Sequence, residues 1–106
     1  MKIKDDNDKK KEELYDRVLV SVGRKPNCED LGLENTKVAR DEKGFIKVNE
    51  RQETTDPSIF AIGDVTPLPQ LAHVASSGAN YVIDSLTSGE KIPFPKDTIP
   101  NCVFTN

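Results

Sequence analysis

The residues best suited to chemistry in this chain lie in the stretch TTDPSIFAIGDVTPLPQLAH, at 54–73. An apolar run ends there at Gly63-Asp64, two prolines follow, and the chain's only histidine, His73, comes after them. In α/β proteins, a strand that ends this way and leads through a loop into a helix is where ligands bind. Gly63 would let a ligand approach the backbone, because it has no side chain to fill the space. The Asp64 carboxylate only accepts hydrogen bonds and would suit a ligand hydroxyl.

The loop after Asp64 directs backbone amides toward the same place. Its prolines stiffen the turn, so the amides of Leu71, Ala72 and His73 are expected to point away from the start of a helix. Such amides carry partial positive charge, which favours an electron-rich ligand atom. The plainer interpretation is a turn in which Asp64 caps nearby backbone and His73 forms a hydrogen bond at the helix end. A lone histidine without a cysteine or carboxylate at catalytic spacing is not expected to act as acid, base or metal ligand.

Three apolar segments predict strands that hold this loop. Residues 15–23, YDRVLVSVG, have the β-branched content of a strand buried on both faces, and residues 2–4, KIK, are expected to form a hairpin with them across a charged loop. Residues 44–50, GFIKVNE, alternate apolar and polar after a turn at 41–44. Residues 58–64, SIFAIGD, have the continuous apolar run of a central strand.

One amphipathic helix is predicted after the proline loop, with Gly89 as its stop. Gly78 inside it costs about 1 kcal/mol relative to alanine, which indicates close packing against that turn. Residues 91–101 contain three prolines and are expected to form an extended spacer before a last strand, CVFT, at 102–105. The apolar residues at helical spacing are Leu71, Ala75, Ala79, Val82, Ile83 and Leu86.

Composition narrows the classes of function. The chain has 106 residues, of which 35% are hydrophobic, and a net charge of -3, so one domain or part of one is expected and a nucleic-acid partner is not. No apolar run approaches the roughly 20 residues of a membrane span, and the lysine-rich start lacks the apolar stretch of a secretion signal. We therefore expect a soluble, intracellular protein without a membrane partner. Cys28 and Cys102 fit neither a disulfide framework nor a metal site, so structural thiols are expected.

Two long segments carry a family resemblance. They are VLVSVGRKPN at 18–27 and DEKGFIKVNERQETTDPSIFAIGDVTPLPQLAHVASSG at 41–78. In this order and at this spacing they resemble the carboxyl-terminal half of the FAD domain of the pyridine nucleotide-disulfide oxidoreductases. LAH at 71–73 is similar to the lipoamide enzymes of that family, whereas glutathione reductase-like members carry a different tripeptide. The lipoamide enzymes oxidise dihydrolipoyl groups and pass electrons through a redox disulfide and FAD to NAD+.

The resemblance implies roles for particular residues. Asp64 would hydrogen-bond the ribitol chain of FAD, and residues 70–73 would run past the pyrimidine edge of the flavin, where amides stabilise negative charge on the reduced ring. Gly23 would lie near bound NAD. No catalytic residue and no metal ligand is implied, because the family's redox cysteine pair, Gly-rich fingerprints and catalytic histidine-glutamate pair have no match here. The implied FAD contacts are Gly63, Asp64, Gln70, Leu71, Ala72 and His73.

The expected fold class is mixed α/β, a partial FAD-binding domain with few strands and one helix. Residues 1–23 would be the tail of an NAD-binding domain, 24–92 the carboxyl-terminal part of the FAD-binding domain, and 93–106 a linker and the first strand of a dimer-forming interface domain. We expect a segment of a longer protein, with Met1 added or fortuitous, that is inactive alone. The resemblance implies a homodimeric parent in the cytoplasm or in a mitochondrial or other organelle matrix. It would serve the lipoyl-bearing acyltransferase of a 2-oxoacid dehydrogenase complex.

A second hypothesis is a non-catalytic interaction module. The predicted CVFT strand has no following partner in the chain, and the other half of the sheet has no match. Exposed strand edges pair readily with other chains. The chain would then associate with itself through those edges.

Overall fold

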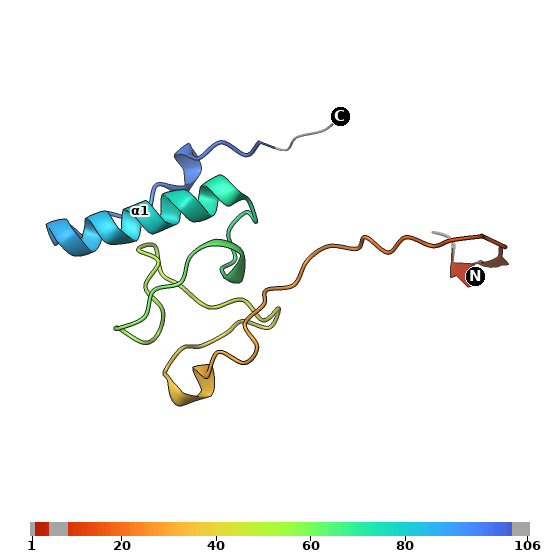
Figure 1. The fold of residues 1–106 in the computed structure, drawn as a ribbon, viewed down its shortest axis with the longest axis horizontal. Helices are drawn as coiled ribbons and strands as arrows, with labels where there is room; N and C mark the ends of the chain where they lie inside the picture. The colour runs from red at the N-terminus through yellow and green to blue at the C-terminus, as the bar shows by residue number, and fades with distance from the viewer. Residues whose placement is uncertain (1, 5–8, 103–106) are drawn as a thin grey trace.

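The structure is a computed structural model that describes residues 2–4 and 9–102 (Figure 1). Its amino-terminal end is a short antiparallel hairpin of β1 (Lys2–Lys4) and β2 (Lys10–Glu12), with Lys2 opposite Glu12. The prediction that KIK pairs with residues 15–23 is therefore wrong. Pairing with the nearer segment closes a shorter loop, which costs less conformational entropy.

The apolar segment 15–23 does not form the predicted buried strand. It runs as extended chain between the hairpin and the rest of the molecule (Figure 1), and the side chains of Leu19 and Val22 are 90% and 93% exposed. A strand satisfies its backbone groups through a neighbouring strand. In the part of the chain that the structure describes, no segment pairs with this one.

The predicted turn at 41–44 is confirmed. The Gly44 amide donates to the carbonyl oxygen of Asp41 at 3.0 Å. The Asp41 carboxylate accepts from the Phe45 amide at 2.9 Å, so the aspartate closes the turn with both its backbone and its side chain.

The strands predicted at 44–50 and 58–64 are not regular strands. Each contributes one isolated antiparallel bridge, in which residues 39–41 lie beside 45–47 and residues 52–54 lie beside 59–61 for only two backbone hydrogen bonds each. In the second segment the Ile59 carbonyl accepts two hydrogen bonds from Thr54, one from its amide at 3.1 Å and one from its hydroxyl at 2.8 Å. The two bridges join Arg40 to Ile46 and Glu53 to Phe60.

These loops enclose a small apolar core. Cys28, Ile46 and Ala61 form its centre, and each is at most 6% exposed. Cys28 therefore has the structural position expected of it, whereas Cys102 is exposed; both are free thiols. The partly buried residues packed against this centre are Leu33, Val38, Val48 and Val65. Leu33 opens the short 3-10 helix η1 (Leu33–Asn35).

The predicted helix is confirmed as α1 (Ala72–Ser88). Gly89 ends it with φ of 72° and donates its amide to the Ser85 carbonyl at 3.0 Å. A Cβ on Gly78 would lie 3.3 Å from Cγ2 of Ile62, which confirms the close packing inferred from this glycine. Within the described residues, no helix is long and apolar enough to cross a membrane.

The apolar face of α1 is shorter than the spacing predicts. Val74 and Gly78 are its buried residues, whereas Ile83 and Leu86 are each 60% exposed and do not join the core. The loops that enclose the core are called the body below. The helix packs on the body along its first half, while its last turns extend past it (Figure 1). Periodicity identifies a helix face, but only the neighbouring elements decide how far that face is covered.

Residues 90–101, which we call the strap, run back along α1 toward the start of the helix (Figure 1). The strap contains the 3-10 helix η3 (Lys96–Thr98), so it is not the uniformly extended spacer predicted. Phe94 is 6% exposed, and its amide donates to the Glu50 carbonyl at 2.7 Å. Beyond Cys102, the strand predicted at 102–105 lies outside the described residues.

Candidate functional site

The site begins at the Gly-Asp turn, which forms the 3-10 helix η2 (Gly63–Val65). Thr66 closes this turn, because its hydroxyl and its amide both donate to the Gly63 carbonyl, at 2.7 and 2.9 Å. Thr66 is fully buried, at 0% exposure. Sequence reasoning missed this residue; the available signal was a hydroxyl side chain three residues after the glycine, which commonly returns to the backbone in turns.

The backbone conformation of Gly63 and its packing against α1 both favour glycine at this position. Its φ is +68°, in the region that favours glycine, and a Cβ there would meet Cβ of Ala75 at 3.0 Å. Ala75 of α1 therefore lies where a side chain on Gly63 would point. A backbone contact between Gly63 and FAD stays a prediction.

Asp64 presents its carboxylate to solvent. Its side chain is 53% exposed, and Oδ2 lies 3.8 Å from Nη1 of Arg24, which is itself 69% exposed. An ion pair this long and this exposed contributes little, so the carboxylate keeps its capacity to accept hydrogen bonds. The Gln70 side chain donates to the Asp64 carbonyl at a long 3.4 Å, which brings the proline loop back over the turn.

The start of α1 offers two of the three predicted amides. Leu71 is the N-cap residue, without a side-chain cap, and its own amide donates to the Pro69 carbonyl at 2.9 Å. The Leu71 amide is therefore not available, which corrects that part of the prediction. For Ala72 and His73, no acceptor of the backbone amide occurs among residues 2–4 and 9–102. Uncapped amides of this kind carry the positive end of the helix dipole.

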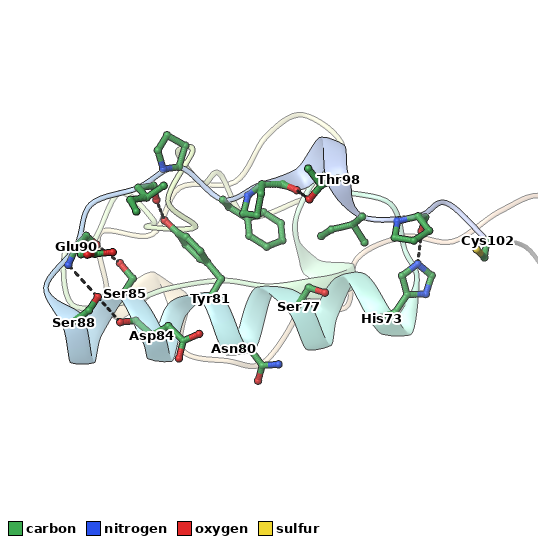
Figure 2. A pocket seen from close by; sticks show the side chains of 16 residues that line it. His73, Ser77, Asn80, Tyr81, Asp84, Ser85, Ser88, Glu90, Thr98 and Cys102 are labelled. Carbon is green, nitrogen blue, oxygen red and sulfur yellow. Dashed lines mark hydrogen bonds between the residues drawn. The ribbon is translucent and has the colours of Figure 1, made fainter.

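The His73 imidazole does not face a ligand on the Gly-Asp side. Its Nε2 lies 2.5 Å from the Pro100 carbonyl oxygen, across a groove between α1 and the strap (Figure 2). This matches the plainer interpretation, in which the histidine forms a hydrogen bond at the helix end. Only the His73 backbone is left to serve a ligand at the turn.

The groove has a volume of about 860 Å3 and is lined by one face of α1 and by the strap (Figure 2). Tyr81 crosses it, because its hydroxyl donates to the Ile92 carbonyl and its ring meets Phe94 edge-on, with 5.2 Å between ring centres. Sequence reasoning did not find this groove, since it depends on the strap folding back. The available signal was a polar or aromatic side chain at every fourth position, namely His73, Ser77, Tyr81 and Ser85.

Gly23 lies apart from these residues, in the exposed segment before the body. Its φ is +112°, and nothing lies within 4 Å of where a Cβ would be. Its neighbour Arg24 is the residue that approaches Asp64. The structure thus brings together residues 63, 64 and 70–73 and leaves the NAD contact of Gly23 a prediction.

The carboxylates with shifted pKa values stabilise loops. The Ser58 hydroxyl and the Lys37 amide donate to Asp56 and lower its pKa. The Arg51 guanidinium donates twice to Glu53, at 3.2 and 2.7 Å, and lowers the pKa of that carboxyl. Both carboxylates thus stabilise turns of the body.

A metal site is not found in the described part of the chain. Among these residues, no group of three or more His, Cys, Asp or Glu could hold a metal ion.

The match with known proteins covers most of the chain. Residues 2–79 match the family described as pyridine nucleotide-disulphide oxidoreductase. The chain belongs to this family, whose members use FAD and NAD. The resemblance inferred from the order of the motifs is confirmed.

The relatives are dihydrolipoyl dehydrogenases, which are oxidoreductases. The chain is 39% identical over 106 residues to that of Buchnera aphidicola subsp. Schizaphis graminum, covering 100% of this chain and 22% of the relative. It is 53% identical over 92 residues to that of Thermus scotoductus, covering 87% of this chain and 20% of the relative. The identity to the mitochondrial dihydrolipoyl dehydrogenase of Caenorhabditis elegans is 42% over 100 residues, covering 93% of this chain and 20% of the relative. The chain thus spans about a fifth of the length of these relatives.

Proposed function

We propose that this chain is the FAD-contacting segment of a dihydrolipoyl dehydrogenase-like flavoenzyme. Such an enzyme oxidises dihydrolipoyl groups and passes the electrons through a redox disulfide and FAD to NAD+. The observation that carries the proposal is the junction at residues 63–73, where an exposed carboxylate and two uncapped helix amides are held by one buried turn. The family match over residues 2–79 supports it.

The residues of the junction fit a flavin nucleotide. The Asp64 carboxylate would accept hydrogen bonds from ribitol hydroxyls, and charge-assisted bonds of this kind are stronger than neutral ones. The amides of Ala72 and His73 would donate to the pyrimidine edge of the ring and stabilise negative charge there. FAD, when bound, supplies the electron-accepting group. The task of these residues is to hold and orient the cofactor.

The remaining steps belong to other parts of the proposed parent. No redox cysteine pair and no Gly-rich fingerprint occurs in the sequence, so this chain alone does not run the dithiol chemistry. We propose that the parent is a homodimer in the cytoplasm or an organelle matrix, with the lipoyl-bearing acyltransferase of a 2-oxoacid dehydrogenase complex as its partner. Residues 24–92 would then be FAD-domain sequence, flanked by NAD-domain and interface-domain pieces.

Retention of FAD tests the proposal directly. The purified chain is mixed with FAD, free ligand is removed, and the visible absorbance is recorded. We expect a retained flavin band, and we expect Asp64→Asn to weaken binding about tenfold through loss of a charge-assisted hydrogen bond. Asp16→Asn, which removes an exposed carboxylate from the extended segment, is the matched control and should bind as the unchanged chain does. Equal binding by Asp64→Asn would contradict the role of that carboxylate.

A chain that is folded by circular dichroism and retains no flavin would contradict a different part of the proposal. It would mean that residues 63–73 do not form a sufficient site without the Gly-rich half of the family's FAD domain. The two negative results are distinguishable, because one compares variants and the other concerns the unchanged chain.

The second candidate function is self-association. The observation in its favour is the exposed apolar segment around Val20, which includes Leu14 at 99% and Leu19 at 90% exposure and pairs with no described segment. Two copies paired antiparallel about Val20 would place Asp16 of each opposite Arg24 of the other, a favourable cross-strand charge pair. Sedimentation should then show a dimer that Val20→Lys abolishes. A monomer at all concentrations would exclude this function.

A further inference from the structure

The strap is tied to α1 by side chains of one helix face. Three of them, spaced by multiples of four residues, donate hydrogen bonds to strap carbonyls. Because the strap runs opposite to the helix, the last bond along the strap reaches the first turn of α1 (Figure 2). The pairs are Ser85 with Glu90, Tyr81 with Ile92, and His73 with Pro100.

The chemistry of the His73 contact is set by its partner. A carbonyl oxygen only accepts, so Nε2 must donate to Pro100 at 2.5 Å. The neutral tautomer with its proton on Nε2 and the imidazolium both meet this requirement. The Nε2 donor is therefore present in either of these two forms.

The strap is anchored ahead of Pro100 by contacts that do not involve His73. Phe94 anchors the strap in the body, through its burial and its 2.7 Å bond to the Glu50 carbonyl. Closer to Pro100, the proline loop at 68–71 and strap residues 96–101 line one small cavity of about 20 Å3. His73 thus connects the first turn of α1 to an anchored segment far away in sequence.

The first turn of α1 needs such a connection. Leu71 gives it no side-chain cap, and uncapped helix ends open locally at low cost in free energy. The amides of Ala72 and His73 lie in this turn. An amide positions a ligand only while the turn that carries it stays formed.

We infer that His73 is a positioning residue for the flavin: its bond to Pro100 replaces the missing cap and keeps the flavin-facing amides in place. This inference rests on the proposed function for its ligand. It also makes the strap, which leads into the predicted interface-domain strand, part of the support of the cofactor site. The imidazole supports the site from the groove side and makes no contact with the flavin.

Hydrogen exchange of the full chain tests the inference without any cofactor. His73→Phe keeps an aromatic ring and removes the donor, so exchange of the Val74 and Ala75 amides should rise about fivefold, the factor expected for one lost hydrogen bond. His73→Gln places an amide donor at a similar reach and should restore protection. Tyr81→Phe is the matched control, because it also removes one bond to the strap; it should leave Val74 and Ala75 unchanged.

The inference is overturned if His73→Phe leaves these two amides protected, if Tyr81→Phe exposes them equally, or if His73→Gln fails to restore them. In the presence of FAD, His73→Phe should weaken binding about fivefold, and His73→Gln should bind as the unchanged chain does. An unchanged chain that retains no flavin would contradict the proposed function instead. That result is read from absorbance, so it is separate from the exchange comparison.

Discussion

Replacement of Gly63 by alanine measures how tightly the Gly-Asp turn is held against α1. Two costs add in this variant. An L residue at φ of +68° costs roughly 1–2 kcal/mol, because its Cβ approaches the following carbonyl. The new Cβ would also lie 3.0 Å from Cβ of Ala75, and overpacking of this kind costs about 1–3 kcal/mol. We expect Gly63→Ala to lower the free energy of unfolding by about 2–5 kcal/mol.

Gly89→Ala provides the matched control. Gly89 has nearly the same φ, 72°, but nothing lies within 4 Å of where its Cβ would be. Only the backbone cost applies there, so the expected loss is roughly 1–2 kcal/mol. The difference between the two variants isolates the contact with the helix.

Urea unfolding followed by far-ultraviolet circular dichroism gives these free energies, because α1 supplies most of the signal. If Gly63→Ala unfolds the chain outright, the double variant with Ala75→Gly keeps the test decisive. It removes the opposing Cβ at a cost of about 1 kcal/mol in the helix and should recover part of the loss. A loss for Gly63→Ala no larger than for Gly89→Ala, or no recovery in the double variant, would refute the packing argument.

Three further experiments test other parts of the structure: one substitution, one titration and one thiol-reactivity measurement. Gly78→Val should destabilise the chain by about 1–3 kcal/mol, because a Cβ there already lies 3.3 Å from Ile62; unchanged urea midpoints would contradict this. Asp56 should titrate below its ordinary value of 3.8, so its stabilising effect is complete above that pH and is lost as the pH falls through the lowered pKa. An NMR titration midpoint at or above the ordinary value would disprove the proposed turn bonds. Cys102, which is exposed, should react with a thiol reagent in the folded chain, whereas Cys28 at 4% exposure should react only after unfolding; equal rates would count against the core assignment.

Part of the fold is predictable from the sequence because its hydrogen bonds are local. The helix, its stop at Gly89, and the turn that Asp41 closes were all predicted in place. Helix bonds join residues four apart, and an aspartate that caps a turn bonds to amides two to four residues on. Helix and turn bonds therefore depend on residues that are close together in the sequence. The family followed from the order of several such motifs along the chain.

The strands predicted at 15–23, 44–50 and 58–64 were wrong because a strand depends on partners that are distant in sequence. Residues 15–23 have the composition of a buried strand, yet Val22 is 93% exposed where no described segment pairs with it. Residues 58–64 have the apolar run of a central strand and form one bridge. Propensity describes a surface that fits a sheet, but the neighbouring strand decides whether the sheet exists.

The candidate site also has one part that the sequence predicts and another that depends on tertiary contacts. By itself, the sequence determined that a carboxylate, a proline loop and a helix start follow one another at residues 64–73, and it determined the family. Only the tertiary structure decided that Ala75 fills the space beside Gly63, that Thr66 is buried under the turn, and that the His73 side chain bonds the strap. Each of these outcomes depends on contact between segments that are separated along the chain. A local sequence pattern does not predict which separated segments come into contact.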